Sequence, residues 1–412
     1  MRELKPSGIE WVGTIPVEWS VGRIGGLYYL RNQKVSDVDY PPLSVTNKGI
    51  LPQLETAAKS NAHDDRKLVK VGDFAINSRS DRRGSCGISP YEGSVSLINT
   101  ILAPNTEMEP QYFDWLFHTV QFGDEFYKWG HGIVDDLWTT GWQDMKKILI
   151  PLPPLDEQRR IATFLNKKCT EIDSVIADVQ MQVETLESYK RSIVTEKVTK
   201  GLNPEVEFKD SGIQWVGNIP VHWSILRGKY ILSYLQKPVR EEDGVITCFR
   251  DGEVTLRSNR REDGFTMSDK EIGYQGIDVG DLVVHGMDGF AGAIGISDSR
   301  GKASPVLNVL ETKQDKRYIM YYLRSMAYSD VFLALATGIR VRSCDLRWNK
   351  LAELSYPVPP LGEQKAIVKY IDTVIQKTDA VIADKKSQLE TLEEYKKSII
   401  FEYVTGKKEV PA

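Results

Sequence analysis

The sequence predicts an α+β protein made of two similar halves, each a globular block followed by one long helix. Residues 7–19 (SGIEWVGTIPVEW) return as residues 211–223 (SGIQWVGNIPVHW) with three of thirteen positions changed. Each half ends in a long stretch whose apolar residues recur every seven positions, which is typical of a coiled-coil helix. With 412 residues, of which 41% are hydrophobic, the chain has enough material for two separate cores.

Further repeats keep nearly the same spacing. Residues 151–158 (PLPPLDEQ) return as 357–364 (PVPPLGEQ), and residues 184–193 return as 390–399, both displaced by 357 − 151 = 206 positions. This period is much longer than the repeats of solenoids and propellers, so it indicates two domain-sized copies. We expect pseudo-two-fold or tandem symmetry.

The globular blocks, residues 1–155 and 201–360, combine short β-type runs (97–102, 281–284) with glycine turns and a helical stretch at 318–324, which predicts α+β domains. The four cysteines form no Cys-x-x-Cys pair, so they are expected to be packing residues. No signal-peptide core follows Met1, and no run of 18 apolar residues occurs, so a cytoplasmic location is expected. The net charge of −4 argues against a blanket affinity for nucleic acid.

The predicted helices span 156–200 and the first part of 361–412. Each follows a Pro-x-Pro-Pro-Leu segment, with Asp156 or Gly362 as the expected N-cap, and each ends at a glycine, Gly201 or Gly406. A helix of about 44 residues would be roughly 65 Å long. The residues expected at the pairing seams are Leu165, Ile172, Ile176, Val179, Val183 and Leu186 in the first helix, and Ile371, Ile375, Ile382, Leu389 and Leu392 in the second.

Thr378 and Lys385 interrupt the second seam. Acidic and basic residues balance along the first helix, which favours a protein-binding rod over a DNA clamp. The alternative is that the helices only hold the domains together.

Inside the blocks a common frame carries different side chains. Val71-Gly-Asp73, Gly84 and Gly87-Ile-Ser89 return as Val279-Gly-Asp281, Gly292 and Gly295-Ile-Ser297, whereas the loop between them reads NSRSDRR at 77–83 and HGMDGFA at 285–291. A later loop differs in the same way, with 132–136 against 338–342. Shared glycine turns with different presented side chains are expected of two readers of different sequences.

Several cations in or near these loops suit contacts to guanine or to phosphate. The candidate DNA-binding residues are Arg79, Arg82, Arg83, Arg257, Arg260, Arg261, His285, Arg340, Arg342 and Arg347. A solvated surface is the alternative for each cluster. The repeated tryptophans (Trp11, Trp19, Trp215 and Trp223) are interpreted as a packed collar at the domain edge rather than as a base-stacking platform.

Catalytic motifs are missing from the sequence. There is no Asn/Asp-Pro-Pro-aromatic motif of an amino-methyltransferase, no Gly-x-x-x-x-Gly-Lys-Ser/Thr loop for ATP and no metal-binding His/Cys cluster. No catalytic or metal-ligating residue is therefore expected, and the chain is predicted to bind rather than to cut.

Two variable blocks alternating with two long helices, each after Pro-x-Pro-Pro-Leu-x-Glu-Gln, closely resemble the specificity subunit of type I restriction-modification enzymes. The leader Ser-Gly-Ile-x-Trp-Val-Gly-x-Ile-Pro-x-x-Trp fits the same family. The resemblance implies two target recognition domains, each reading one half of a split double-stranded DNA site, with the two helices paired antiparallel. It implies two modification subunits that methylate adenine with S-adenosylmethionine, and restriction subunits that use ATP and Mg²⁺; no cofactor is expected on this chain.

Two other interpretations stay open. A coiled-coil adaptor that assembles proteins without DNA specificity would explain the neutral helices but not the divergent arginine loops. A self-sufficient nuclease would need a site that the sequence does not reveal.

Overall fold

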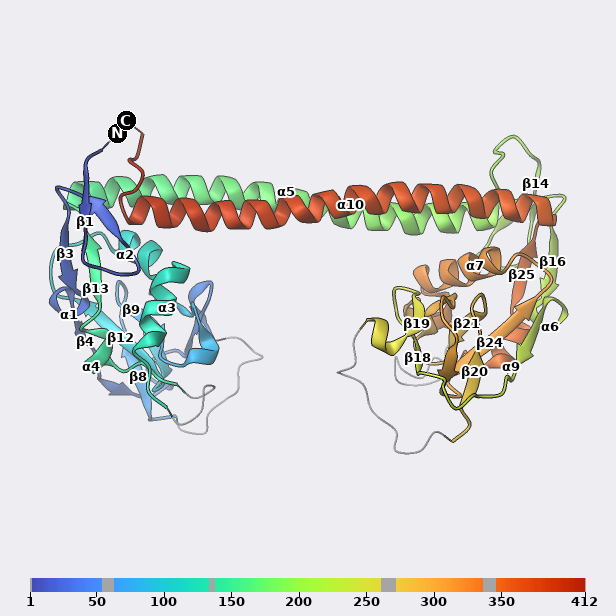
Figure 1. Cartoon of the computed structure of the whole chain (residues 1–412), viewed down its shortest axis with the longest axis horizontal. Coiled ribbons are helices and arrows are strands. Elements are labelled where there is room, and N and C mark those ends of the chain that lie inside the picture. Colours follow the sequence, from blue (N-terminus) through green and yellow to red (C-terminus); the bar gives the residue numbers. More distant parts are fainter. Residues whose placement is uncertain (1, 54–62, 133–137, 261–271, 336–345, 412) are drawn as a thin grey trace. The chain divides into compact units, whose positions relative to one another are not determined.

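The computed structural model describes residues 2–53, 63–132, 138–260, 272–335 and 346–411. It confirms the predicted fold class, with two α+β blocks and two long paired helices (Figure 1). The chain divides into two compact units: unit 1 is Met1–Gln180 with Ser387–Ala412, and unit 2 is Met181–Lys386. Each unit therefore holds one block and one part of each long helix.

The block of unit 1 is mainly β structure with short helices. Its elements are β1 (Leu4–Pro6), β2 (Thr14–Pro16), β3 (Ser20–Arg23), α1 (Ile24–Leu27), β4 (Tyr28–Leu30), β5 (Lys34–Val35), β6 (Leu43–Thr46), β7 (Gly49–Pro52), β8 (Arg66–Val69), β9 (Phe74–Asn77), the 3-10 turn η1 (Ser80–Arg82), β10 (Cys86–Ile88), β11 (Gly93–Ser96), β12 (Asn99–Pro104), α2 (Pro110–Phe117), α3 (Val120–Lys128), α4 (Trp142–Met145) and β13 (Leu149–Leu152). The first long helix, α5 (Leu155–Lys200), follows directly.

The block of unit 2 repeats this order almost element for element. It contains β14 (Phe208–Asp210), β15 (Asn218–Pro220), β16 (Ser224–Arg227), α6 (Gly228–Ile231), β17 (Leu232–Leu235), β18 (Ile246–Cys248), β19 (Val254–Leu256), η3 (Arg257–Asn259), β20 (Gln275–Ile277), β21 (Leu282–His285), η4 (Gly289–Ala291), β22 (Ile294–Ile296), β23 (Gly301–Ala303), β24 (Leu307–Thr312), α7 (Lys316–Tyr328), α8 (Val331–Ala334), α9 (Trp348–Glu353) and β25 (Ser355–Val358). The second long helix, α10 (Leu361–Val404), follows it.

The sheets repeat as well. The main antiparallel sheet has the order β10-β9-β12-β4 in unit 1 and β22-β21-β24-β17 in unit 2. The register also repeats, since Asn77 pairs with Asn99 and His285 pairs with Leu307, each displaced by 285 − 77 = 307 − 99 = 208 positions. Residues 77 and 285 therefore end equivalent strands.

Each core lies between the main sheet and the long helices. In unit 1 the buried aromatic residues of α2 and α3, such as Phe113 and Phe122, pack with Leu165 of α5 and Val404 of α10. In unit 2, Tyr318 and other residues of α7 pack with the end of α5 and the start of α10. The block helix α2 or α7 thus joins its sheet to both long helices.

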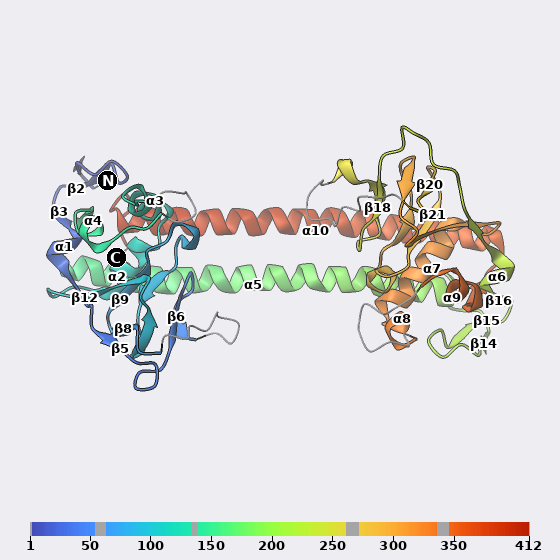
Figure 2. The same ribbon diagram turned by 90° about the horizontal axis from the view of Figure 1, so that it is seen from below.

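The two long helices run antiparallel and lie side by side in Figures 1 and 2. In unit 1, Lys396 Nζ of α10 lies 2.6 Å from Asp173 Oδ1 of α5. In unit 2, Lys190 Nζ of α5 lies 2.5 Å from Asp379 Oδ1 of α10. These ion pairs are copies of one another at the displacement of 206, since 396 − 190 = 379 − 173. Each side chain retains solvent exposure, so the pairs fix register more than they add stability.

The helix starts differ from the prediction. Both helices begin one residue earlier, at Leu155 and Leu361, so Asp156 and Gly362 lie inside the first turn and are not N-caps. The carbonyl oxygen of Pro154 accepts the backbone N–H groups of Glu157 and Gln158 and so starts the helix. The predicted C-terminal glycines are confirmed, because Gly201 and Gly406 have φ of 76° and 69°.

Each block holds one end of both long helices in what we call a helix socket. In unit 1 the Trp19 indole donates to Glu157 Oε2 at 2.8 Å, near the start of α5, and the Tyr112 hydroxyl donates to Val404 O at 2.8 Å, at the end of α10. Gly406 packs so closely on Pro16 that an added Cβ would lie 2.4 Å from its ring.

The socket of unit 2 uses the equivalent residues. The Trp223 indole donates to Glu363 Oε1 at 3.1 Å, and the Tyr318 hydroxyl donates to Val198 O at 3.0 Å. Trp19 and Trp223 are each 1% exposed. The packed-collar interpretation of these two tryptophans is therefore confirmed. The repeated Trp, Pro and Glu residues are explained because they hold the ends of the long helices in the sockets.

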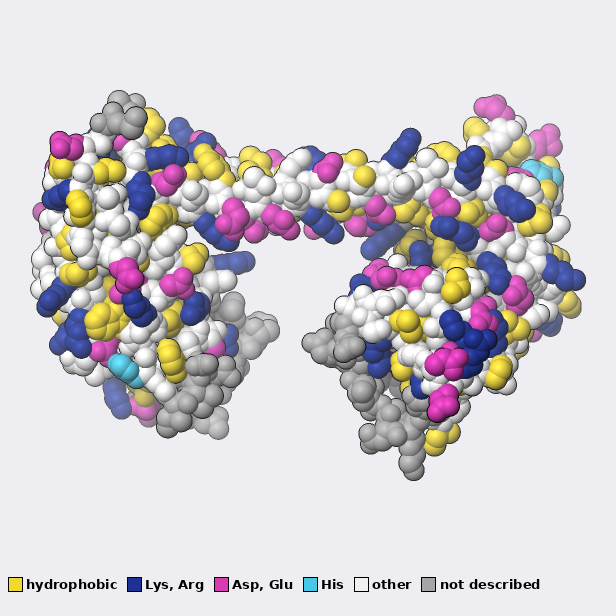
Figure 3. All heavy atoms as spheres, in the orientation of Figure 1, with side chains coloured by type: hydrophobic (Ala, Val, Ile, Leu, Met, Phe, Trp, Pro, Cys, Tyr) yellow, Lys and Arg dark blue, Asp and Glu magenta, His cyan; other side chains and the backbone are white. Residues whose placement is uncertain are grey.

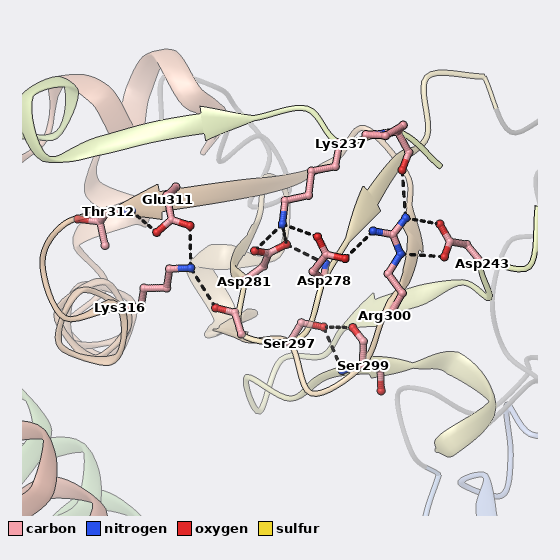
Figure 4. A network of polar contacts seen from close by, with 12 residues as sticks. Lys237, Asp243, Asp278, Asp281, Ser297, Ser299, Arg300, Glu311, Thr312 and Lys316 are labelled. Carbon is pink, nitrogen blue, oxygen red and sulfur yellow. Dashed lines mark hydrogen bonds and ion pairs between the residues drawn. The ribbon is translucent and has the colours of Figure 1, made fainter. Parts of the chain in front are cut away.

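A network of charged side chains links several segments of unit 2 (Figure 4). Lys237 Nζ lies 2.8 Å from Asp278 Oδ2 and 2.7 Å from Asp281 Oδ2. Arg300 makes two bonds to Asp243, at 2.9 and 2.8 Å, and a third to Asp278 at 2.5 Å. Unit 1 has a smaller version, in which Arg31 binds Asp73.

This network predicts that the folding stability of unit 2 depends on pH. Hydrogen bonds from Lys237 and then Arg300 lower the pKa of the Asp278 carboxyl to about 2, below the value of about 3.9 of an unfolded aspartate. The ionised Asp278 carboxylate therefore contributes its full share to the folding stability of unit 2 above about pH 4. This stabilisation is lost as the pH falls from about 4 to about 2. Because the side chain is 43% exposed, we expect no more than about 1 kcal/mol.

The measurement is the thermal unfolding of unit 2 in the whole chain and in Asp278→Asn. The unfolding temperatures should differ at pH 7 and converge toward pH 2. A difference that is the same at pH 7 and at pH 2.5 would contradict the assignment.

Candidate nucleic-acid interface

The repeated frame residues build one turn in both blocks. Gly72 and Gly280 adopt φ of 85° and 86°, which favours glycine. The carboxylates of Asp73 and Asp281 then accept the backbone N–H of the residue three positions earlier, each at 2.8 Å. Both carboxylates are buried and paired with a cation, so this turn is fixed before β9 and β21 begin.

Gly87 and Gly295 allow a hairpin to pack against the strand after the variable loop. A Cβ at Gly87 would lie 2.9 Å from Gly49 Cα, at the start of β7. A Cβ at Gly295 would lie 2.0 Å from Gly252 O, between β18 and β19. In both units a hairpin therefore packs on the strand that follows the variable loop.

In unit 1 the variable loop 77–83 is hydrogen-bonded to residues 138–140, which follow the second divergent loop. Residues 133–136 and 338–342 of the second divergent loops lie outside the described residues. The backbone N–H of Ser80 donates to Trp138 O, and that of Thr140 donates to Ser78 O, both at 3.0 Å. Arg79 forms a bridge with Thr139, which forms another with His131. Three chain segments therefore make one small antiparallel ladder at the exposed end of the block.

The three candidate arginines of unit 1 lie at this surface, and all are exposed. Arg83 pairs with Asp124 at 2.6 Å and lies over the Tyr127 ring, whereas Arg82 lies 3.6 Å from Asp81. Within the described part of the chain, no bond to the Arg79 guanidinium is found. Arg79 is thus the candidate of this loop whose charge is least compensated.

In unit 2 the equivalent loop carries more internal pairing. The backbone N–H of Leu346 donates to Gly286 O at 2.8 Å, which corresponds to the Thr140–Ser78 bond of unit 1. Arg250 pairs with Asp288 at 3.0 Å and so joins the β18–β19 hairpin to the loop. His285 Nδ1 accepts the N–H groups of Met287 and Asp288, at 3.2 and 2.9 Å. Burial lowers the pKa of His285, which favours the neutral ring that this acceptor role requires.

The other predicted cations of unit 2 are partly engaged by the protein. Arg260 lies 2.7 Å from Asp251 and 3.1 Å from Glu253, and stacks over Phe249. Arg257 lies 3.4 Å from the Thr247 hydroxyl. Arg347 precedes α9. Arg261, Arg340 and Arg342 lie outside the described residues.

The predicted seam residues of the two long helices are all at least partly buried. Leu165, Ile172, Val179, Ile371 and Ile382 are buried. The half-buried ones are Ile176, Val183, Leu186, Ile375, Leu389 and Leu392. The interrupting Thr378 is buried too, and its hydroxyl donates to Val374 O at 2.8 Å.

Sequence reasoning missed four residues of this interface: His131, Trp138, Thr139 and Met287. Trp138 is 36% exposed and Met287 is 47% exposed. An apolar residue is normally interpreted as core, and β-bridges between residues 79 and 139 leave no periodic signal. The differences between the repeated loops were the only available indication.

The described residues do not meet the requirements of a metal site or of a helix that spans a membrane. Among them no group of three or more His, Cys, Asp or Glu side chains could hold a metal ion. No helix in the same part of the chain is long and apolar enough to cross a membrane. Figure 3 shows acidic and basic side chains interspersed along the long helices on the face in view. The ladder of unit 1 carries a guanidinium, a hydroxyl and an imidazole, groups that suit recognition of base edges and phosphates.

Comparison with known proteins points to one family. Residues 273–391 match the family described as "Type I restriction modification DNA specificity domain". The chain is 24% identical over 432 aligned positions to the putative type I restriction enzyme MjaX specificity subunit of Methanocaldococcus jannaschii, covering 96% of this chain and 95% of that one. It is 25% identical to the MjaVIII specificity subunit of the same organism, covering 95% and 93%.

Solved structures establish the likeness of fold. A chain from a study of complex assembly and conformational transition of the type I R-M system matches with a TM-score of 0.71 at 16% identity, covering 96% of this chain and 99% of that one. The HsdS subunit from Thermoanaerobacter tengcongensis matches with a TM-score of 0.51 at 16% identity, covering 96% and 98%.

Proposed function

Since the chain is a specificity subunit of the type I restriction-modification class, we propose that it selects a bipartite DNA sequence with one block for each half-site. The observation that carries this is the pair of equivalent loops, 77–83 and 285–291, which the same frame holds and which present different side chains. A common frame positions the loops, and the different side chains select different bases. The chain is a non-catalytic subunit of a larger enzyme.

The partners follow from the same class. We propose that modification subunits carrying S-adenosylmethionine dock on the long helices, and that restriction subunits carrying ATP and Mg²⁺ complete the complex in the cytoplasm. Exposed apolar side chains at repeated positions support docking on the helices. Val175 and Val381 are 46% and 44% exposed, and Tyr189 and Tyr395 are 46% and 48% exposed. With a net charge of −4, the chain is expected to share phosphate binding with its partners.

The test of this function is the pattern of methylated adenines in host DNA with and without the chain. One bipartite motif should disappear when the chain is removed. If 77–83 is replaced by the residues of 285–291 in a chain that still folds and assembles, recognition of one half of the motif should change while the other half stays. Methylation of the original motif by such a variant would show that these loops do not select the sequence.

The alternative of a protein-assembly adaptor without DNA specificity receives no support from the relatives. It would predict loss of assembly, rather than altered target choice, when the loops are exchanged.

A further inference from the structure

Two residues of different chemistry occupy the same place in the two blocks, Arg79 in unit 1 and Met287 in unit 2. The preceding residues, Ser78 and Gly286, make the same backbone bonds. Their N–H groups donate to Ile98 O and Val306 O, at 3.4 and 2.8 Å. Their carbonyl oxygens accept the N–H groups of Thr140 and Leu346, at 3.0 and 2.8 Å. The next residue of each chain segment is therefore equivalent.

The backbone of this next residue is braced in both units from the end of the preceding strand. Asn77 Oδ1 accepts the Arg79 N–H at 3.1 Å, and His285 Nδ1 accepts the Met287 N–H at 3.2 Å. Asn77 and His285 end equivalent strands and are half-buried. Although amide and imidazole differ, each supplies an acceptor two residues before the exposed side chain. His285 thus acts as a positioning residue.

The two side chains that follow these braced backbones are both exposed. Met287 is 47% exposed, although burial of its thioether would be favourable. Arg79 is exposed, and its guanidinium makes no bond within the residues that the structure describes. Both side chains are therefore accessible to a ligand.

Arg79 also lies in a row of side chains whose size suits the major groove of DNA. Bridge partners in a ladder have their side chains on the same face, so Arg79, Thr139 and His131 form a row across three segments. With about 5 Å between neighbours, the row is roughly 10 Å long, which spans about three base steps at 3.4 Å each. A β-ladder of this width enters the major groove of B-DNA.

We propose that positions 79 and 287 are the paired specificity positions of the two blocks, with Arg79 selecting a guanine and Met287 selecting an A·T pair. A guanidinium binds O6 and N7 of guanine through two hydrogen bonds, whereas an apolar side chain contacts the methyl group of thymine. This inference rests on the proposed function and adds the base chemistry of each half-site.

The experiment exchanges the two side chains in the whole chain, reconstituted with its modification subunits, as Arg79→Met and Met287→Arg. Adenine methylation of a library of bipartite sites is the readout. Arg79→Met should lower discrimination for guanine at one position of one half-site by about 5- to 150-fold. Met287→Arg should create a preference for guanine at one position of the other half-site.

Controls separate base reading from charge and folding. Arg23→Met removes an exposed arginine at the end of β3, and Val279→Arg adds a charge at a residue 66% exposed; neither should change base preference. Arg79→Lys keeps the charge but loses the two-pronged geometry, so discrimination should still fall. Thermal unfolding of each variant checks that it is folded.

The inference is overturned if folded Arg79→Met and Met287→Arg chains keep the wild-type base preference at every position. It is also overturned if Arg79→Met weakens binding of all sequences equally and reduces the salt slope by about one, because Arg79 would then bind a phosphate. If the wild-type complex methylates no bipartite site, the proposed function itself fails.

Discussion

Trp19→Ala is expected to destabilise unit 1 by about 3–5 kcal/mol, the range for removing a buried tryptophan. The ring is 1% exposed, and its indole binds Glu157 at the start of α5. The substitution leaves a cavity and a buried carboxylate that loses one donor. Because Tyr112 lies beside this ring and binds the end of α10, the variant should loosen both helices at this socket.

Hydrogen exchange of the whole chain during mild denaturation is the appropriate measurement, because two units need not unfold in one step. Amides of unit 1 should lose protection while those of unit 2 keep it, and Trp223→Ala should give the reverse. Tyr91→Ala is the matched control, since this aromatic residue of unit 1 is 41% exposed and should change stability by less than about 0.5 kcal/mol. Equal protection of unit 1 in Trp19→Ala and Tyr91→Ala would refute the socket.

Ile172→Asp is expected to separate the long helices within unit 1, at a cost of at least about 3 kcal/mol. Ile172 is 5% exposed on the helix seam, where a carboxylate would lose its water without gaining a partner. The helix provides its own control, because Val175 is three residues further on and 46% exposed. Val175→Asp should leave the folding of the isolated chain unchanged.

The two variants also separate folding from docking. If the exposed apolar side chains of the helices receive the modification subunits, Val175→Asp should weaken assembly of the complex, measured by sedimentation, although the isolated chain melts normally. Ile172→Asp should impair both measurements. Normal assembly of Val175→Asp would place the docking surface away from this residue, and normal melting of Ile172→Asp would exclude the proposed helix seam.

The fold was largely predictable because its signals are periodic or repeated. The heptad positions Leu165, Ile172 and Val179 lie on the buried face because coiled-coil geometry determines burial from spacing alone. The helix starts were misplaced by one residue, since the carbonyl of Pro154 serves where a side-chain cap was expected. Such a backbone role has no side-chain signature.

From the sequence, the location of the candidate interface could be predicted, but the contacts of its residues could not. The frame glycines indicated where the loops lie, but not that Arg79 bridges Thr139 in a distant segment. His285 was selected for its possible contact with DNA, whereas its Nδ1 accepts two backbone N–H groups. Met287 was not selected at all, because the exposure of an apolar side chain depends on tertiary structure.

The socket of unit 1 has a consequence for synthesis of the protein on the ribosome. Unit 2 is a continuous segment, but unit 1 needs residues 387–412, which are made after unit 2. Until Val404 emerges, the Tyr112 hydroxyl lacks its acceptor at the end of α10, and the surface that packs on Gly406 is uncovered. At 5–20 residues per second, translation from residue 181 to residue 404 takes about 10–45 s. We therefore expect the later-made unit to complete its fold first, while the earlier one waits with an apolar surface that chaperones can bind.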